Sequence, residues 1–370
     1  MKILIVGAGA SGITAAINLK RKNPHDEILV IEHLDKPLKK ILATGNGKCN
    51  LGNANIDFAR FNNPEFSKKI IGNYNYESFF DSISIKTKLV GDLAYPISES
   101  AVSVREGLLN EATKLGVKIH TEEKLIDYTV SNQISVSTNK GEYIVDKLVL
   151  AGGLMSSPKL GSDGSVLEVL KKHNYKIDEP KVGLAPLITK EKIRELDGVR
   201  TKATVKLFSQ NKLVHEENGE VLFREHGLSG IVIFNTMSII SRDPAKQYKI
   251  QLDLLPDFTD EYLKNYCKSR IFSDFLLAFI NPKISQYLTK RFDKDSEILK
   301  SIKALDFEFE KASGFEFSQV SVGGIKVTEV NDNLESIHEK NVFIIGELLN
   351  IDGPCGGYNL TWAFASALKI

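Results

Sequence analysis

Cysteine is scarce in this sequence, with three residues in 370, which is too few for a disulfide framework. Cys49, Cys267 and Cys355 also lack metal-site spacing and fit a reducing cytoplasm. No apolar run is long enough to span a bilayer, and no signal peptide is recognisable before the first strand. The formal net charge is only +1, without a polybasic or acidic tail. The sequence therefore disfavours nucleic acid and membranes as partners and predicts a soluble, cytoplasmic protein.

Short, continuous apolar runs are present instead, and they are typical of parallel strands buried on both faces. Ile3–Val6 is followed by a glycine-rich turn, a helical pattern and a second run, Ile28–Ile31, which completes a βαβ unit. Lys36–Tyr95 is interpreted as a long loop followed by helices, and the strand pattern returns at Lys147–Ala151 and Asn341–Glu347. The length and these separated strands predict an α/β fold with an insertion in its dinucleotide-binding domain.

The insertion differs in pattern. Val199–Phe208 and Val221–Met237 are predicted to be strands, with a turn at Asn218–Gly219. Thr259–Phe309 is predicted to be mostly helical, with core candidates Leu276, Leu277, Phe279 and Ile280. We therefore expect a discontinuous Rossmann-like domain, an inserted β domain and an inserted helical domain, at residues 1–185 plus 320–370, 186–255 and 256–319.

The turn after the first strand satisfies G-x-G-x-x-G through Gly7, Gly9 and Gly12, with a strand before it and a helix after it. The first glycine permits the turn, the second lets the backbone approach a pyrophosphate, and the third allows close helix–strand packing. The helix N-terminus offers free N–H groups and a partial positive charge. Glu32, at the end of the second strand, is placed to bind ribose hydroxyls and disfavours the 2′-phosphate of NADP. A tight turn without a ligand is the less favoured interpretation.

This motif does not separate FAD from NAD, because both cofactors contain the same adenosine diphosphate half. Other segments bear on the choice. Glycine-bearing strand ends or loops occur at Thr44–Asn50, Ala151–Gly153, Gly346–Glu347 and Gly353–Leu360. A helix beginning near Asn359 would direct its positive dipole end at a ligand, and the edge of a flavin that gains negative charge on reduction suits it best. These segments favour FAD.

The same segments, together with His226–Gly230 and Gly323–Gly324, resemble the HI0933-like family of FAD-dependent oxidoreductases in order and spacing across almost the whole chain. The Thr44–Asn50 loop and the Gly356–Asn359 turn are the most specific of them. The resemblance implies a flavoprotein fold of the two-dinucleotide-binding-domain type, with a β-barrel-like and a helical insertion, and tightly bound FAD. Two departures are Lys48, where the family more often has arginine, and a final helix that looks short.

The resemblance also implies which residues bind the cofactor. Gly7–Gly12 would hold the pyrophosphate, Thr44–Asn50 would line the flavin and ribityl side, and Leu125 would meet adenine through its backbone. Gly346–Glu347 would reach the ribityl–phosphate stretch, and Gly357–Leu360 would face the pyrimidine edge of the isoalloxazine. The expected cofactor-binding residues are Gly7, Ala8, Gly9, Ala10, Ser11, Gly12, Glu32, His33, Thr44, Gly45, Asn46, Gly47, Lys48, Cys49, Asn50, Leu125, Ala151, Gly152, Gly153, Gly346, Glu347, Gly356, Gly357, Tyr358, Asn359 and Leu360.

No catalytic residue can be assigned from the sequence, so the difficult chemistry falls to the flavin. Cys49 and Cys355 both lie in loops assigned to the flavin, so they could form a dithiol relay. The simpler interpretation is that they are small residues packed near the cofactor, and it is favoured because the C-x-x-C spacing of redox pairs is missing. Lys48 either stabilises negative charge on the reduced flavin or is a solvated lysine. His226 is an acid/base candidate because histidine titrates near neutrality, although ordering a turn is the favoured interpretation.

The expected function is FAD-dependent transfer of a hydride or electrons between a reduced donor and a small organic substrate, for example at a conjugated carbon–carbon double bond. NAD(P)H as donor would dock transiently, because a second G-x-G-x-x-G between a strand and a helix is absent from the sequence. The alternative is a redox-sensing or structural flavoprotein without turnover. An RNA-modifying enzyme is disfavoured, because phosphate contacts need clustered lysine and arginine. No metal site is expected.

Overall fold

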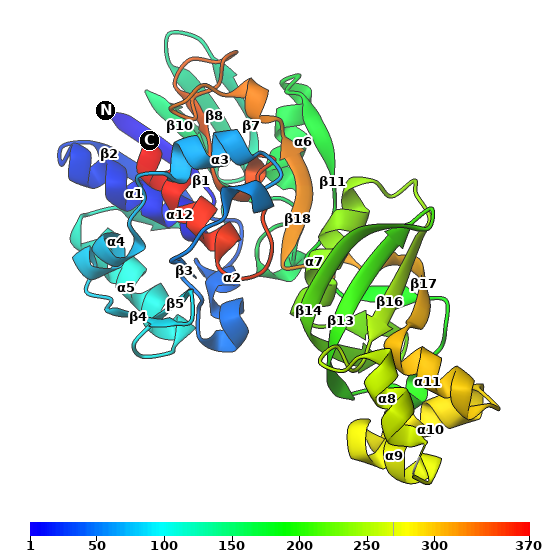
Figure 1. Cartoon of the computed structure of the whole chain (residues 1–370). Helices are drawn as coiled ribbons and strands as arrows, with labels where there is room; N and C mark the ends of the chain where they lie inside the picture. The colour runs from blue at the N-terminus through cyan, green and yellow to red at the C-terminus, as the bar shows by residue number, and fades with distance from the viewer. Residues whose placement is uncertain (269) are drawn as a thin grey trace. The chain divides into compact units, whose positions relative to one another are not determined.

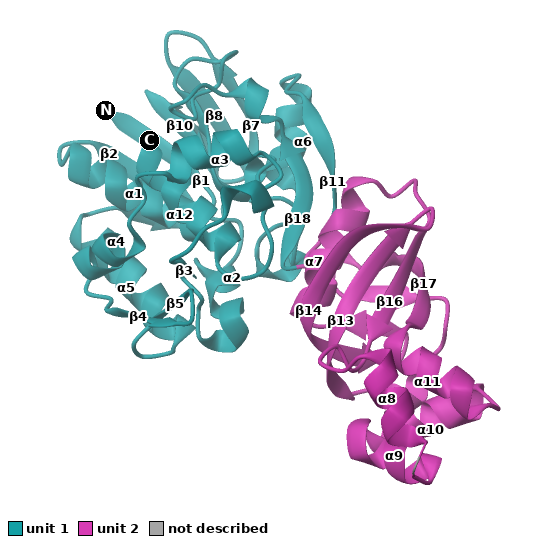
Figure 2. Cartoon of the chain, in the orientation of Figure 1, with its two compact units in different colours: residues 1–181, 319–370 teal, residues 182–318 magenta. Residues whose placement is uncertain are grey.

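The computed structural model describes residues 1–268 and 270–370, which divide into two compact units (Figures 1 and 2). Unit 1 comprises Met1–Lys181 and Gln319–Ile370, and unit 2 comprises Val182–Ser318. The chain leaves unit 1 along β11 (Ile177–Gly183) and returns along β18 (Val320–Ile325), and these two strands pair with each other. Within the described ranges, no helix has the length and apolar character needed to cross a membrane.

A five-stranded parallel sheet forms the centre of unit 1, with the strand order β19-β10-β1-β2-β6. At the end of β1, Val6 is in register with Ile31 of β2 on one side and Leu150 of β10 on the other. The carboxyl ends of these strands are therefore level. Along the chain, β2 and β6 are added on one side of β1, and β10 and β19 are then added on the other side. Such a point is where ligands bind in open α/β sheets. The strands are β1 (Lys2–Val6), β2 (Glu27–Ile31), β6 (Lys118–His120), β10 (Lys147–Leu150) and β19 (Val342–Ile344).

Helices and two small antiparallel sheets surround this central sheet. α1 (Ala10–Lys22) packs against α12 (Tyr358–Lys369), so the first and last helices lie side by side (Figure 1). The small sheets have the orders β3-β5-β4 and β7-β8-β9. Their strands are β3 (Gly52–Asn53), β4 (Thr87–Val90), β5 (Leu93–Pro96), β7 (Leu125–Val130), β8 (Ile134–Thr138) and β9 (Gly141–Val145). The other helices are α2 (Lys39–Leu42), α3 (Pro64–Ile71), α4 (Tyr76–Ser82), α5 (Ala101–Lys114) and α6 (Ser165–Lys172).

Unit 2 contains a closed barrel with the order β12-β15-β14-β13-β16-β17. Side chains of the barrel and of its helices form one buried cluster, which includes Phe223 and Phe307 of the barrel and Phe275 and Leu288 of the helices. The strands are β12 (Leu187–Thr189), β13 (Arg200–Ser209), β14 (Lys212–Arg224), β15 (Gly227–Ser229), β16 (Tyr248–Asp253) and β17 (Leu305–Ala312). The helices are α7 (Ile231–Arg242), α8 (Asp260–Cys267), α9 (Phe272–Phe279), α10 (Pro282–Arg291) and α11 (Asp295–Lys303).

The predicted strand Val221–Met237 is wrong in its second half, because Ile231–Arg242 forms α7. The predicted turn at Asn218–Gly219 is also wrong, since both residues lie inside β14. The hairpin turns instead at Gln210–Asn211, where both residues have positive φ angles. Gly219 serves packing, because a Cβ there would overlap the side chain of Val232 in α7.

Two further predictions need correction. The segment 36–95 was expected to contain a loop and helices, but it also contributes the β4–β5 hairpin. Leu277 was expected in the core, yet it is 63% exposed, whereas Leu276 and Ile280 are buried. Position on the helix explains the difference, because Leu276 shares the inner face of α9 with Phe272, Phe275 and Phe279, at spacings of three and four residues, and Leu277 is rotated away from that face.

Candidate functional site

The glycine turn joins the carboxyl end of β1 to the N-terminus of α1. Gly7 has φ of 101°, and a Cβ there would lie 2.5 Å from the Ala151 carbonyl oxygen. A Cβ at Gly12 would overlap the Gly7 carbonyl oxygen, so packing requires glycine at both positions. A Cβ at Gly9 would meet no atom of residues 1–268 and 270–370 within 4 Å, so this backbone faces open space. With no side-chain cap and no acidic residue in the first turn of α1, N–H groups there can receive a diphosphate.

Glu32 follows β2 and is buried beside this turn. Its Oε2 accepts a hydrogen bond from the Ala8 N–H at 2.9 Å, and its Oε1 accepts one from the Leu34 N–H at 2.9 Å. Burial opposes ionisation, but the hydrogen bonds from His33, Leu34 and Ala8 outweigh it and lower the pKa of the Glu32 carboxyl. Conversely, the hydrogen bond to Glu32 raises the pKa of His33, whose Nδ1 lies 3.1 Å from Oε1. An ionised carboxylate thus lies at the carboxyl end of β2, as ribose binding requires.

The strand end at Gly346 completes this edge of the sheet. Gly346 has φ of 68°, and a Cβ there would lie 2.5 Å from Ser11 Oγ in α1. Its N–H donates to Ser366 Oγ at 3.1 Å, and its carbonyl accepts from Trp362 Nε1 at 2.8 Å. Both partners belong to α12, so the final helix fixes the strand end next to the glycine turn. The structure therefore brings together the predicted residues of the turn, Glu32, Ala151 and Gly346.

A polar cluster that the sequence did not reveal lies around Glu347. Lys40 Nζ lies 2.8 Å from Glu347 Oε2, 2.5 Å from Ser156 Oγ and 3.2 Å from Ser162 Oγ. Glu347 Oε1 accepts hydrogen bonds from Ser156 Oγ at 2.5 Å and from the Ser321 N–H at 2.8 Å. The only sequence signal was a lysine and two serines close to glycine-rich segments, without motif spacing. We call Lys40, Ser156, Ser162 and Glu347 the Lys40 cluster.

The segments predicted to meet the flavin ring pack on the small sheet β3-β5-β4. In the Thr44–Asn50 loop, a Cβ at Gly45 would lie 3.5 Å from the ring of Tyr95 in β5. In the last turn before α12, Asn53 Nδ2 of β3 donates to the Gly356 carbonyl at 3.0 Å, and a Cβ at Gly357 would overlap the Gly52 backbone. Both predicted segments therefore lie against one structural element.

Within the same turn, the side chain of Asn359 binds the backbone of the preceding loop. Its Oδ1 accepts from the Gly353 N–H at 3.0 Å, and its Nδ2 donates to the Gly353 carbonyl at 2.9 Å. Tyr358 is buried and its hydroxyl accepts from the Asp57 N–H at 3.2 Å. These contacts fix the turn whose next residue, Leu360, is half-buried.

Lys48 and the cysteines have different surroundings. Lys48 is exposed, and its Nζ lies 2.8 Å from Glu99 Oε2, a hydrogen bond that raises the pKa of Lys48. Cys49 is fully buried, and burial raises the pKa of its thiol to about 11. Cys355 is half-buried, with Sγ 3.8 Å from Gln319 Oε1. A buried thiol with a raised pKa is a poor nucleophile, so the structure favours packing over a relay for Cys49.

Leu125 and His226, which the sequence also singled out, lie in other segments of the chain. Leu125 begins β7, where it is buried and paired with Thr138. Two residues earlier, the Glu123 N–H donates to the Glu32 carbonyl at 2.8 Å, which ties this segment to the second strand. His226 belongs to unit 2, where its exposed side chain lies in the turn between β14 and β15.

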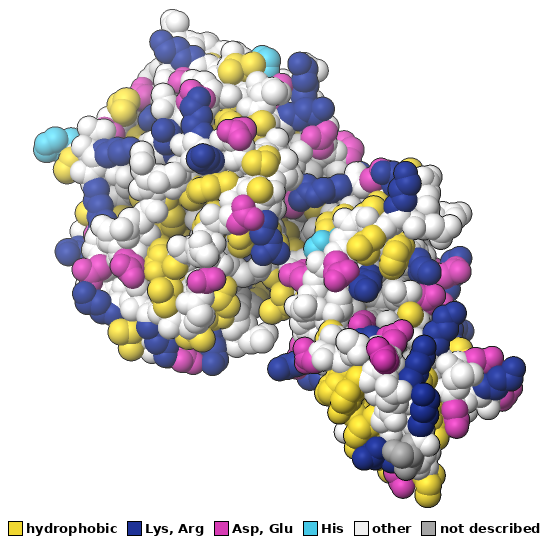
Figure 3. All heavy atoms as spheres, in the orientation of Figure 1, with side chains coloured by type: hydrophobic (Ala, Val, Ile, Leu, Met, Phe, Trp, Pro, Cys, Tyr) yellow, Lys and Arg dark blue, Asp and Glu magenta, His cyan; other side chains and the backbone are white. Residues whose placement is uncertain are grey.

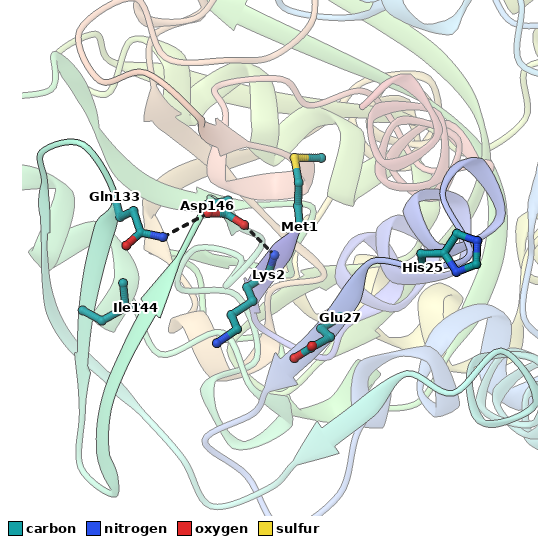
Figure 4. A pocket seen from close by; sticks show the side chains of 7 residues that line it. All are labelled: Met1, Lys2, His25, Glu27, Gln133, Ile144 and Asp146. Atoms are coloured by element: carbon teal, nitrogen blue, oxygen red, sulfur yellow. Dashed lines mark hydrogen bonds between the residues drawn. The ribbon is translucent and has the colours of Figure 1, made fainter.

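Two surface pockets contain none of the predicted residues. The pocket in Figure 4 lies at the amino-terminal ends of the parallel strands, opposite the glycine turn, and the Asp146 carboxylate there accepts from Lys2 N–H at 2.8 Å and from Gln133 Nε2 at 3.2 Å. Its lining residues are Met1, Lys2, His25, Glu27, Gln133, Ile144 and Asp146. The second, of about 580 Å³, lies beside α5 and the segments 83–86 and 96–98. Ligands of parallel sheets bind at the carboxyl ends, so we assign neither pocket to the cofactor.

Comparison with known proteins identifies the family. The model of the HI0933-like protein Rossmann domain matches residues 1–370. The chain belongs to the HI0933-like family. The 3-dehydro-bile acid delta(4,6)-reductase of Clostridium scindens is 30% identical over 395 residues, which cover 99% of this chain and 97% of the relative. The ribosomal RNA dihydrouridine synthase of Escherichia coli is 24% identical over 393 residues, which cover 98% of this chain and 95% of the relative.

A solved structure shows the same fold. The 3-ketosteroid delta1-dehydrogenase of Sterolibacterium denitrificans matches with a TM-score of 0.51 and 10% identity, over 99% of this chain and 98% of that one. The predicted fold class, an α/β Rossmann-like flavoprotein with an inserted barrel, is confirmed. As a member of the HI0933-like family, the chain is an FAD-dependent oxidoreductase.

Proposed function

We propose that this HI0933-like protein is a reductase that adds a hydride and a proton across a carbon–carbon double bond conjugated to a carbonyl group, in a small organic substrate. The names of two full-length relatives support this reaction class. A 3-dehydro-bile acid delta(4,6)-reductase and a dihydrouridine synthase both add hydrogen to such a double bond, although their substrates differ greatly. The reaction class is thus the feature that the relatives share, and the 30% identical relative favours a small molecule.

The observation that carries the binding of FAD, on which this reaction depends, is the open backbone at Gly9 beside the ionised Glu32. We assign Gly7–Gly12 to the FAD diphosphate, Glu32 to the ribose hydroxyls, and the Thr44–Asn50 and Gly356–Leu360 segments to the isoalloxazine end. The α1 N-terminus supplies N–H donors, whereas Glu32 supplies acceptors. Bound flavin supplies the two-electron chemistry, and these residues bind and orient it.

We further propose NAD(P)H as the electron donor, docking transiently at the flavin. The sequence has a single G-x-G-x-x-G between a strand and a helix, and that site is assigned to FAD. A donor that leaves after hydride transfer needs no second dinucleotide-binding domain.

Anaerobic titration of the FAD-loaded protein tests both parts of the proposal. NADH or NADPH should bleach the flavin, and an enone steroid or other conjugated enone should then reoxidise it with formation of the saturated ketone, detected by mass spectrometry. Bleaching without reoxidation by any enone would refute the proposed substrate class. Protein that neither pyridine nucleotide bleaches would contradict the donor and favour the redox-sensing alternative.

A uridine in ribosomal RNA is the second candidate substrate, favoured by the dihydrouridine synthase relatives at 23% and 24% identity. The charge distribution argues against it, because the net charge is +1 and basic and acidic side chains are interspersed on the face shown in Figure 3. Incubation of the reduced protein with unmodified ribosomal RNA, followed by nucleoside mass spectrometry, separates the two. Dihydrouridine without enone reduction would select RNA.

A further inference from the structure

The Lys40 cluster connects three chain segments at the carboxyl edge of the parallel sheet. Lys40 belongs to α2, Ser156 and Ser162 lie in the segment after β10, and Glu347 follows β19. The lysine ammonium has three N–H donors, and three oxygens lie within 3.2 Å of it. The side chains of Lys40 and Glu347 are 28% and 18% exposed. This ion pair is partly desolvated and geometrically specified, unlike a surface pair.

Among the residues that the structure describes, the hydrogen bonds of Glu347 leave one acceptor position free. An ionised carboxylate offers about four lone-pair sites. Oε1 receives Ser156 Oγ and the Ser321 N–H, and Oε2 receives Lys40 Nζ. A Cβ at Gly153 would lie 2.7 Å from Ser162 Oγ and 3.8 Å from Glu347 Oε2, so glycine there leaves room for Ser162 in the cluster. The neighbouring strand-end residue, Gly346, approaches Ser11 at the start of α1, which places Glu347 next to the glycine turn.

We propose that Lys40 is a positioning residue that fixes the Glu347 carboxylate as an acceptor for a hydroxyl of the FAD ribityl chain, with Ser156 and Ser162 holding the ammonium in place. The inference rests on the proposed binding of FAD at this edge. Direct contact between Lys40 and the FAD diphosphate is the competing arrangement. The structure favours positioning, because the three donors of Lys40 already have protein acceptors, whereas one site on Glu347 Oε2 has none among the described residues.

Comparison of FAD with ADP separates these arrangements, because ADP contains the diphosphate and lacks the ribityl chain. Dissociation constants for both ligands are measured by calorimetry on apo wild-type protein, Lys40→Met and Glu347→Gln. We expect Lys40→Met to weaken FAD at least tenfold, about 1.4 kcal/mol, and to change ADP less than twofold. Glu347→Gln should do the same, and the double variant should be no weaker than the poorer single variant, since both act through one contact.

Lys39→Met is the matched control. Lys39 lies in the same short helix and pairs with Asp35 at 2.5 Å on the surface, so its removal changes the net charge equally without touching the Lys40 cluster. It should leave both dissociation constants within twofold of wild type. If Lys40→Met does not fold, as judged by circular dichroism, Ser156→Ala takes its place, because it removes a hydrogen bond to Lys40 and one to Glu347.

Three results would overturn the inference. Equal weakening of ADP and FAD would place the ammonium on the diphosphate. Unchanged FAD affinity in folded Lys40→Met, or in Ser156→Ala where that variant replaces it, would make the cluster purely structural. If the fold-increase in the FAD dissociation constant of the double variant equals the product of the two single increases, Lys40 and Glu347 act separately. Failure of wild-type protein to bind FAD would instead refute the proposed function itself.

Discussion

Replacing Gly9 and Gly12 with alanine should separate cofactor binding from folding, although both belong to the same motif. At Gly12 the new Cβ would overlap the Gly7 carbonyl oxygen. The clash involves the backbone, so rotation of a side chain could not relieve it. We expect Gly12→Ala to lower the free energy of unfolding of the apo protein by about 3 kcal/mol, the upper part of the range for overpacking. At Gly9 the φ angle is −81°, and the Cβ would meet no atom of the described part of the chain within 4 Å. Gly9→Ala should change the free energy of unfolding of the apo protein by no more than about 0.5 kcal/mol. Alanine lowers the conformational entropy of the unfolded chain, and this gain offsets its poorer performance as an N-cap residue.

Gly9→Ala should act on FAD instead. A methyl group in the open space would keep the diphosphate from the backbone, and loss of one charge-assisted hydrogen bond costs about 1.5–3 kcal/mol. The dissociation constant should rise roughly 10- to 150-fold. Urea denaturation of apo protein gives the stabilities, and titration of FAD followed by flavin fluorescence gives the affinities. Wild-type affinity in folded Gly9→Ala would refute the assignment of the diphosphate to this turn.

Three other substitutions test the surrounding structure. The protonated form of His33 is stabilised by Glu32, so the advantage of wild type over His33→Gln in urea midpoint should be complete below pH 6.5 and shrink as the pH rises through the raised pKa; a constant advantage would contradict this. Cys49→Ser should retain hydride transfer from NAD(P)H to flavin and on to substrate in rapid-mixing assays, and abolished turnover with FAD still bound would revive the relay. Gly357 has φ of 90° and its Cβ would overlap Gly52, so Gly357→Ala should cost the apo protein about 2 kcal/mol or more, and an unchanged melting temperature would exclude that clash.

Local chemistry explains which parts of the fold could be predicted. Strands buried on both faces require continuous apolar runs, so Ile3–Val6 and Ile28–Ile31 were found within one residue of β1 and β2. The glycine turn and Glu32 could be predicted because each need for glycine or a carboxylate arises within a few residues of the strand ends. The same holds for α12, whose start near Asn359 follows from the glycines before it.

Long-range packing explains the failures. The β-branched residues of 231–240 resemble a strand, but a buried position against β14 favours α7. Asn218–Gly219 has the composition of a hairpin turn, whereas contact with Val232 is what requires the glycine. Lys40 and Glu347 are 307 residues apart, so no local pattern could join them.

The most direct test of the account is the visible absorption spectrum of the purified protein, followed by release and identification of its chromophore by chromatography and mass spectrometry. We expect a flavin spectrum from protein as isolated or after addition of FAD, and FAD as the released compound. A colourless protein that takes up no added FAD would contradict the assignment of this crevice to a flavin dinucleotide.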